Sequence, residues 1–178
     1  EYVPQTLDKW LAAKLTVGGE VAATALDFVE NKLKETNEFM NSHGLIHFDA
    51  HFDNILADDD TIYVSDFGLA LCSLFEISKE EADLFDNYLT YDRCSSATNF
   101  LHCIIASLLG KDRWSVTLKN IANDELREVE PSVAIIIKRY AAIAEVMADY
   151  YQNMQKVSKS TPYPAEKLKK LLDQIGNV

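Results

Sequence analysis

Residues 47–68 read HFDAHFDNILADDDTIYVSDFG, and this stretch decides how the rest of the chain is interpreted. Polar and charged side chains crowd into residues 47–54, and Asp66 opens the tripeptide DFG twelve positions later. Short apolar runs flank the polar segment: LI precedes it, ILA follows it, and the alternating TIYVSD leads to Asp66. We therefore predict a polar loop between short strands, with its functional groups at residues 47–54 and 66–68.

A metal site is one interpretation of the polar segment. His47 and His51 are four residues apart, as in zinc-binding helices, but the HExxH pattern needs a glutamate where this chain has Phe48. No cysteine or third histidine lies nearby, and Asp58-Asp59-Asp60 lacks the glycine and distal glutamate of a calcium-binding EF-hand loop. The sequence favours neither zinc nor calcium, and we expect residues 58–60 to form a solvated turn.

Phosphoryl transfer fits the spacing better. That reaction needs a carboxylate to orient an attacking hydroxyl, and oxygen ligands for Mg²⁺ at the phosphates. The pattern HxDxxxxN followed by DFG supplies both. Asp49 would take the hydroxyl proton, while Asn54 and Asp66 would hold the metal.

The segments HFDAHFDNIL and YVSDFGLA resemble the catalytic loop and metal-binding motif of the protein-kinase-like superfamily, which includes protein kinases, aminoglycoside phosphotransferases and choline kinases. Upstream, EYVP resembles the hinge between the two kinase lobes, and residues 20–43 resemble the long helix before the catalytic loop. The chain, 1–178, thus resembles a kinase C-terminal lobe, with a hinge at 1–5, a catalytic loop at 47–54 and a metal motif at 66–68.

This resemblance implies the catalytic and nucleotide-binding roles. Asp49 would be the catalytic base, and Asn54 and Asp66 would be the Mg²⁺ ligands. The backbone of Glu1 and Val3 would form hydrogen bonds with the adenine of ATP.

Further roles follow from the same resemblance. Leu56 would pack beneath the adenine ring, and His47 would tie the loop to the core. Asp92 would be the buried aspartate that braces the catalytic loop, and Gly68 would support the metal motif.

Two features leave the phosphate acceptor open between a protein serine or threonine and a small-molecule hydroxyl. His51, two residues after the catalytic aspartate, is typical of small-molecule phosphotransferases, whereas Phe67-Gly68 is typical of protein kinases.

No glycine-rich loop or phosphate-binding lysine precedes the hinge. We therefore expect this chain to be the C-terminal lobe of a longer kinase, without its N-terminal lobe, and we expect the fragment to be inactive alone. The alternative is a pseudokinase or regulatory lobe that binds a partner without catalysis.

The composition is that of one globular domain of 178 residues, with 48% hydrophobic and 25% charged residues. A net charge of −11 argues against nucleic-acid binding. Three cysteines without a CxxC pair indicate reduced thiols, and the longest apolar run, FLHCIIASLLG, is too short to cross a membrane. We therefore expect a cytoplasmic protein.

Apolar periodicity and capping residues predict a mainly α fold with one small β-ribbon, as in the C-terminal lobe of the α+β protein-kinase-like fold. The predicted helices cover residues 7–15, 20–43, 78–90, 95–110, 114–123, 131–155 and 164–175.

Overall fold

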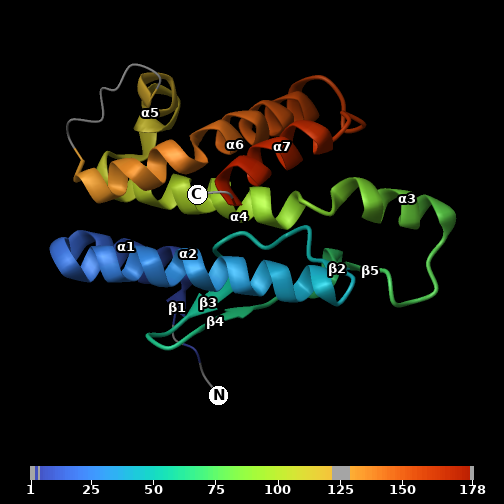
Figure 1. Cartoon of the computed structure of the whole chain (residues 1–178), viewed down its shortest axis with the longest axis horizontal. Coiled ribbons are helices and arrows are strands. Elements are labelled where there is room, and N and C mark those ends of the chain that lie inside the picture. Colours follow the sequence, from blue (N-terminus) through green and yellow to red (C-terminus); the bar gives the residue numbers. More distant parts are fainter. Residues whose placement is uncertain (1–2, 4, 122–128, 177–178) are drawn as a thin grey trace.

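The chain is mainly helical, and its computed structural model describes residues 3, 5–121 and 129–176 (Figure 1). Among these residues lie seven α-helices: α1 (Leu7–Val17), α2 (Gly19–Ser42), α3 (Lys79–Tyr88), α4 (Tyr91–Leu108), α5 (Trp114–Ile121), α6 (Pro131–Lys156) and α7 (Ala165–Gly176). Two short 3₁₀ turns, η1 (Phe67–Leu69) and η2 (Lys111–Arg113), complete the helical part.

The strands form two small antiparallel sheets. The first has the order β1-β3-β4, from β1 (Gln5–Thr6), β3 (Ile55–Ala57) and β4 (Ile62–Val64). The second pairs β2 (Leu45–Ile46) with β5 (Leu71–Cys72). The polar segment 47–54 thus connects the two sheets, because it follows a strand of one and precedes a strand of the other.

Helix α4 is the centre of the molecule. It packs against α1 and α2 on one side and against α6 and α7 on the other (Figure 1). Its fully buried side chains include Phe100, Leu101 and Ile104, which join the main core with α1, α2 and α6. A smaller core joins the N-terminal half of α4 to α7 through Ala97 and Leu168.

Local sequence signals explain where several helices begin and end. Gly18 and Gly19 both have positive φ, which separates α1 from α2. Gly44 has a φ of 66° just after α2, and its carbonyl accepts a hydrogen bond from the Ser73 N–H at 2.8 Å. Ser78 and Glu81 form a reciprocal capping box at the start of α3.

The expected turn at residues 58–60 is the hairpin turn between β3 and β4. The Asp58 carboxylate accepts hydrogen bonds from the N–H groups of Thr61 and Asp60, at 2.8 and 2.9 Å. These two bonds hold the pKa of the Asp58 carboxyl below its usual value.

The prediction of a mainly helical fold with a small antiparallel sheet is confirmed, with three differences. Helix α4 begins at Tyr91 instead of residue 95, and neither β1 nor β5 was predicted. Residues 122–123 of the predicted helix 114–123 lie outside the described residues. Among the described helices, none combines the length and apolarity that a membrane span requires.

The cysteines carry free thiols, as expected. Cys94 and Cys103 are buried in α4, and burial raises the pKa of each thiol to about 12. Both therefore stay protonated at neutral pH and act as packing residues.

Candidate functional site

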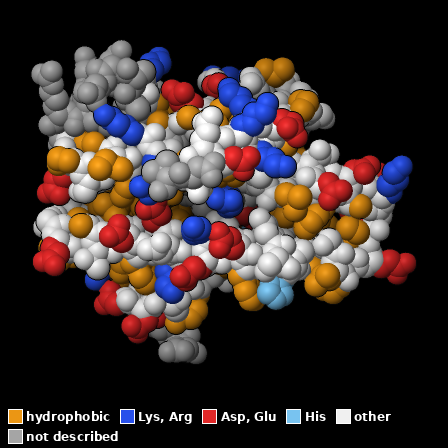
Figure 2. All heavy atoms as spheres, viewed as in Figure 1, with side chains coloured by type: hydrophobic (Ala, Val, Ile, Leu, Met, Phe, Trp, Pro, Cys, Tyr) orange, Lys and Arg blue, Asp and Glu red, His pale blue; other side chains and the backbone are white. Residues whose placement is uncertain are grey.

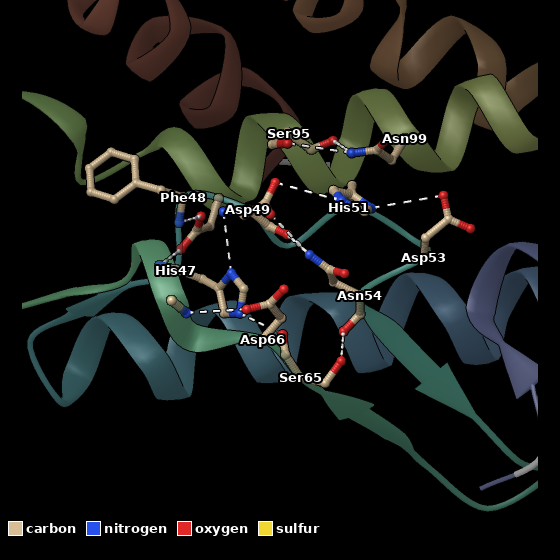
Figure 3. A network of polar contacts seen from close by, with 12 residues as sticks. His47, Phe48, Asp49, His51, Asp53, Asn54, Ser65, Asp66, Ser95 and Asn99 are labelled. Carbon is tan, nitrogen blue, oxygen red and sulfur yellow. Dashed lines mark hydrogen bonds and ion pairs between the residues drawn. The ribbon is translucent and has the colours of Figure 1, made fainter.

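The polar loop 47–54 lies against the N-terminal half of α4, and it is joined by hydrogen bonds to Asp92 of that helix and to Ser65, which follows β4 (Figure 3). The carboxylates of Asp49 and Asp66, the amide of Asn54 and the ring of His47 all belong to this part of the molecule.

His47 is completely buried and joins the loop to the segment before DFG. Its Nδ1 accepts a hydrogen bond from the Asp49 N–H at 3.2 Å, so Nε2 carries the proton and donates to the Ser65 carbonyl oxygen at 3.0 Å. The His47 ring also packs on the Phe67 ring, with centroids 4.7 Å apart. His47 therefore holds two segments together and offers no free nitrogen for a metal or a substrate.

Asp92 lies beneath the loop, in the first turn of α4, and is 2% exposed. Its two carboxylate oxygens accept hydrogen bonds from the backbone N–H groups of His47, at 2.6 Å, and Phe48, at 3.0 Å. Burial raises the pKa of the Asp92 carboxyl, and these two N–H groups oppose that rise. This is the contact expected of a carboxylate that braces the loop.

Phe48 has a φ of 64°, in the left-handed region that few residues other than glycine adopt. Its ring contacts those of Tyr88 and Tyr91, with centroids 5.5 Å away in each case. The Asp92 carboxylate on its N–H and the two tyrosines on its ring hold this backbone conformation in place. The chain consequently reverses at Phe48, immediately before Asp49.

Asp49 and Asn54 are bound directly to each other. Asn54 Nδ2 donates to the Asp49 carbonyl oxygen and to Asp49 Oδ2, both at 3.0 Å. With its amide nitrogen committed in this way, Asn54 keeps its Oδ1, to which no described residue donates a hydrogen bond. Asn54 therefore orients a carboxylate with one end and presents an unused acceptor oxygen at the other.

Asp66 also has a left-handed backbone, with φ 58° and ψ 67°. Its Oδ1 lies 3.4 Å from the Gly68 nitrogen, and the side chain is exposed. The preceding residue, Ser65, binds the Asn54 carbonyl oxygen through both its N–H (2.9 Å) and its hydroxyl (2.8 Å). Asp66 therefore directly follows a residue that is fixed to both Asn54 and His47.

His51 lies between two carboxylates of the loop (Figure 3). Its Nε2 is 3.6 Å from Asp49 Oδ1, and its Nδ1 is 4.0 Å from Asp53 Oδ2. All three side chains are partly exposed, so these contacts are weak and responsive to solvent.

The residues predicted to contact a nucleotide lie beside the first sheet. Leu56 is half-buried in β3, between the buried Ile55 and Ala57, so its side chain projects from the opposite face of the strand. Thr6 of β1 pairs with Leu56, and the half-buried Val3 precedes that strand. Glu1 lies outside the described residues.

The loop offers few groups that could bind a metal ion. Within residues 3, 5–121 and 129–176, no three His, Cys, Asp or Glu side chains cluster as metal ligands. Mg²⁺, however, takes few protein oxygens and completes its shell with water and phosphate, and Asn54 Oδ1 and the Asp66 carboxylate fit that requirement.

Two structurally important residues escaped the sequence analysis. Ser65 binds Asn54 and His47 mainly through its backbone. Any residue type could make these backbone contacts, so the sequence does not identify the position. Phe48 was weighed only as a mismatch to a zinc motif, and neither its left-handed conformation nor its tyrosine contacts can be deduced from local sequence.

Comparisons with family models, with curated proteins and with solved structures find no match to this chain.

Proposed function

We propose that this chain carries the catalytic loop of an ATP- and Mg²⁺-dependent phosphotransferase of the protein-kinase-like fold. The reaction would transfer the γ-phosphoryl group of ATP to a hydroxyl of a protein or a small molecule. The observation that carries the proposal is the Asp49–Asn54 pair, in which one amide orients a carboxylate and leaves its own oxygen unused.

Asp49 is the residue that would receive the substrate. Its Oδ2 is held by Asn54 at 3.0 Å, and among the described side chains the polar neighbour of its Oδ1 is His51, at 3.6 Å. A partly exposed carboxylate with one fixed and one accessible oxygen can accept a hydrogen bond from a substrate hydroxyl and orient it for attack.

Asn54 and Asp66 are the residues that would hold Mg²⁺. When bound, the ion would neutralise charge on the phosphate oxygens. Asn54 contributes a neutral oxygen and Asp66 a charged one, which matches the preference of Mg²⁺ for few protein oxygens of these types.

The surrounding contacts suit a reaction that depends on positioning. Asp92 holds the backbone before Asp49, and His47 links that backbone to Ser65, the neighbour of Asp66. Asp49 and Asn54 are thus fixed by hydrogen bonds within the loop, and Asp66 directly follows a residue that is bound to it.

Leu56 supports the nucleotide-binding half of the proposal. Its side chain projects away from the core-facing Ile55 and Ala57, so it offers an apolar surface at the edge of the loop. The flat face of the aromatic adenine ring would pack on such a surface.

The test is transfer of the γ-phosphate label from ATP, with the longest polypeptide that the gene encodes. Acceptors are protein and small-molecule fractions of a cell extract. We expect Asp49→Asn to lower turnover by about 10²-fold or more while nucleotide binding is retained, because only proton acceptance is lost. Asp66→Ala should abolish Mg²⁺-dependent nucleotide binding.

The fraction that carries the label would identify the acceptor class. Asp53→Asn, a charge change on the same loop, is the control and should leave turnover within a few-fold of wild type. Transfer that is unaffected by Asp49→Asn would contradict the catalytic assignment. Mg²⁺-dependent ATP binding without transfer would instead favour a regulatory lobe.

A further inference from the structure

A cavity of about 330 Å³ lies between α2, α4, α6 and α7, and no residue of the loop 47–54 lines it. Helix α4 forms one wall of it, and Arg93, in the cavity wall, directly follows the loop-bracing Asp92. The cavity is thus a separate feature from the site described above.

Positive charge is concentrated at this cavity. Of the residues that the structure describes, three cationic side chains line it, Lys34, Arg93 and Arg139, against one carboxylate, Glu30. Figure 2 shows lysine and arginine side chains over α7 and in the space between α7 and α2, on a chain whose net charge is −11. A local excess of two positive charges on a strongly acidic protein calls for an anionic occupant.

The cations differ in how they are held. Arg139 pairs with Glu30 through Nη1 and Oε1 at 2.5 Å, and the Tyr140 hydroxyl donates to the same oxygen. Arg93 is half-buried, and among the described residues no carboxylate pairs with it or with Lys34. A half-buried guanidinium without an anion is costly, so Arg93 has the most to gain from a bound anion.

Neutral donors lie deeper in the same cavity. Asn37 is 4% exposed, and its Nδ2 donates to the Ser96 hydroxyl at 3.2 Å. Ser96 accepts this bond and donates to no described group, so its hydroxyl proton is available to an anion beside Arg93.

Apolar side chains form another part of the lining. Phe100, Leu172 and Ile175 contribute side chains from α4 and α7. A volume of about 330 Å³ is at the lower end of the range for small-molecule pockets, about 300 to 1,000 Å³.

We propose that this cavity binds a small amphiphilic anion, a carboxylate or phosphate monoester carried on an apolar ring, with the anion on Arg93 and the ring against the α7 side chains Leu172 and Ile175. The ring would be buried by the apolar walls, and the head group would receive charge-assisted hydrogen bonds from Arg93 and a hydrogen bond from Ser96.

The experiment is isothermal titration calorimetry of the 178-residue chain with three probes of one ring system: 1-naphthyl phosphate, 1-naphthoate and the neutral 1-naphthalenemethanol. We expect saturable binding of at least one anion and at least tenfold weaker binding of the alcohol. Comparison of the two anions separates a phosphate site from a carboxylate site, and inorganic phosphate alone measures the contribution of the ring.

Arg93→Gln should raise the Kd of the tighter anion by about tenfold or more, the range expected for a charge-assisted hydrogen bond. Lys34→Gln should raise it less, because Lys34 is exposed. The matched control is Lys32→Gln, which removes a charge from the same helix, but Lys32 pairs with Glu35 at 3.1 Å outside the cavity.

Circular dichroism would verify that each variant is folded, and Arg93→Lys, which retains the charge, replaces Arg93→Gln if that variant unfolds. With Arg93→Lys the rise in Kd should be smaller but still measurable. Equal binding by the wild type and the Arg93 variant, an equal loss in Lys32→Gln, or equal affinity for the neutral alcohol would each overturn the proposal.

Discussion

Two residues with left-handed backbones, Phe48 and Asp66, lie beside the functional groups of the loop. A non-glycine residue in this region costs about 1–3 kcal/mol unless its neighbours hold it there. Asp66 carries the smaller cost, because aspartate tolerates this region better than an aromatic residue does. The larger cost at Phe48 is offset by Asp92 and by two tyrosine contacts, which suggests that the direction of the chain before Asp49 matters to function.

Substitution of Asp92 tests how the backbone before Asp49 is held. In Asp92→Asn, the amide keeps one acceptor oxygen but turns an NH₂ group towards a backbone N–H, so one buried donor of His47 or Phe48 loses its partner. We expect the free energy of unfolding to fall by about 2–3 kcal/mol, measured by urea denaturation. Asp53→Asn, at an exposed position of the loop, should change it by less than about 0.5 kcal/mol.

A wild-type stability for Asp92→Asn would contradict this interpretation. It would mean that one accepting oxygen is sufficient for the two backbone N–H groups.

Contacts between residues that are close in the chain could be predicted best from the sequence. Asp49 and Asn54 are five residues apart, so motif spacing alone predicts that they cooperate, and the structure brings them into contact. Asp92 is more than 40 residues from its partners His47 and Phe48 and was selected only by resemblance to a known family. Ser65 was missed because its contacts are made mainly by backbone atoms, which every residue type possesses.

At the scale of secondary structure, long helices were predictable and short strands were not. Helix α2 repeats its apolar residues every three or four positions over 24 residues. Over this length the pattern predicts a helix even where a single position departs from it. Strands β1 and β5 have two residues each and exist only because distant strands pair with them, β1 with β3 and β5 with β2. Helix α4 begins at Tyr91, before the predicted residue 95, and the segment YDRC has no apolar periodicity that would predict a helix. In this first turn Asp92 accepts hydrogen bonds from the loop.

The β3–β4 hairpin provides a prediction at the same scale. Because the N–H groups of Thr61 and Asp60 bind its ionised form, the Asp58 carboxyl should titrate below its usual pKa of 3.8 in the folded protein. Its depressed pKa means that ionised Asp58 stabilises the fold above the unfolded-state pKa, and that this contribution is lost as the pH falls through the folded-state pKa. An NMR titration of the side-chain carboxyl carbon would measure the midpoint.

Asp58→Ala should accordingly lower the urea midpoint at pH 7, and the difference from the wild type should shrink below about pH 4. Asp60→Ala is the matched control, because the contact of Asp60 with Asp58 uses only its backbone N–H and survives the substitution. A loss of stability that is independent of pH would show that the turn needs the shape of the side chain and not its charge.

At the scale of the whole molecule, an aromatic cluster connects the loop to the C-terminal helices. Phe48 contacts Tyr88 and Tyr91, and both tyrosines contact Tyr163, in the segment between α6 and α7. The Tyr88 hydroxyl also forms a hydrogen bond with that of Tyr150 on α6, at 3.1 Å. The backbone before Asp49 therefore depends on packing contributed by residues about 100 positions away.

Tyr163 tests this connection, because it stacks on Tyr88 with centroids 4.6 Å apart and shares a hydrogen bond with Thr90. Tyr163→Ala should destabilise the protein by about 2–3 kcal/mol through lost burial and ring contacts. It should also speed hydrogen exchange at the amides of Phe48 and Asp49, since Tyr88 and Tyr91 would lose a neighbour that fixes them.

Tyr163→Phe keeps the ring and removes only the hydroxyl, so it should leave the exchange of the loop amides close to wild type. Exchange would be compared under conditions where global unfolding is slow, so that the readout reports local opening of the loop. If Tyr163→Ala destabilised α7 while the amides of Phe48 and Asp49 exchanged as in the wild type, the cluster would be an ordinary piece of core. Faster exchange confined to the loop and its tyrosine neighbours would instead show that the C-terminal helices help to hold the residue that we propose as the catalytic base.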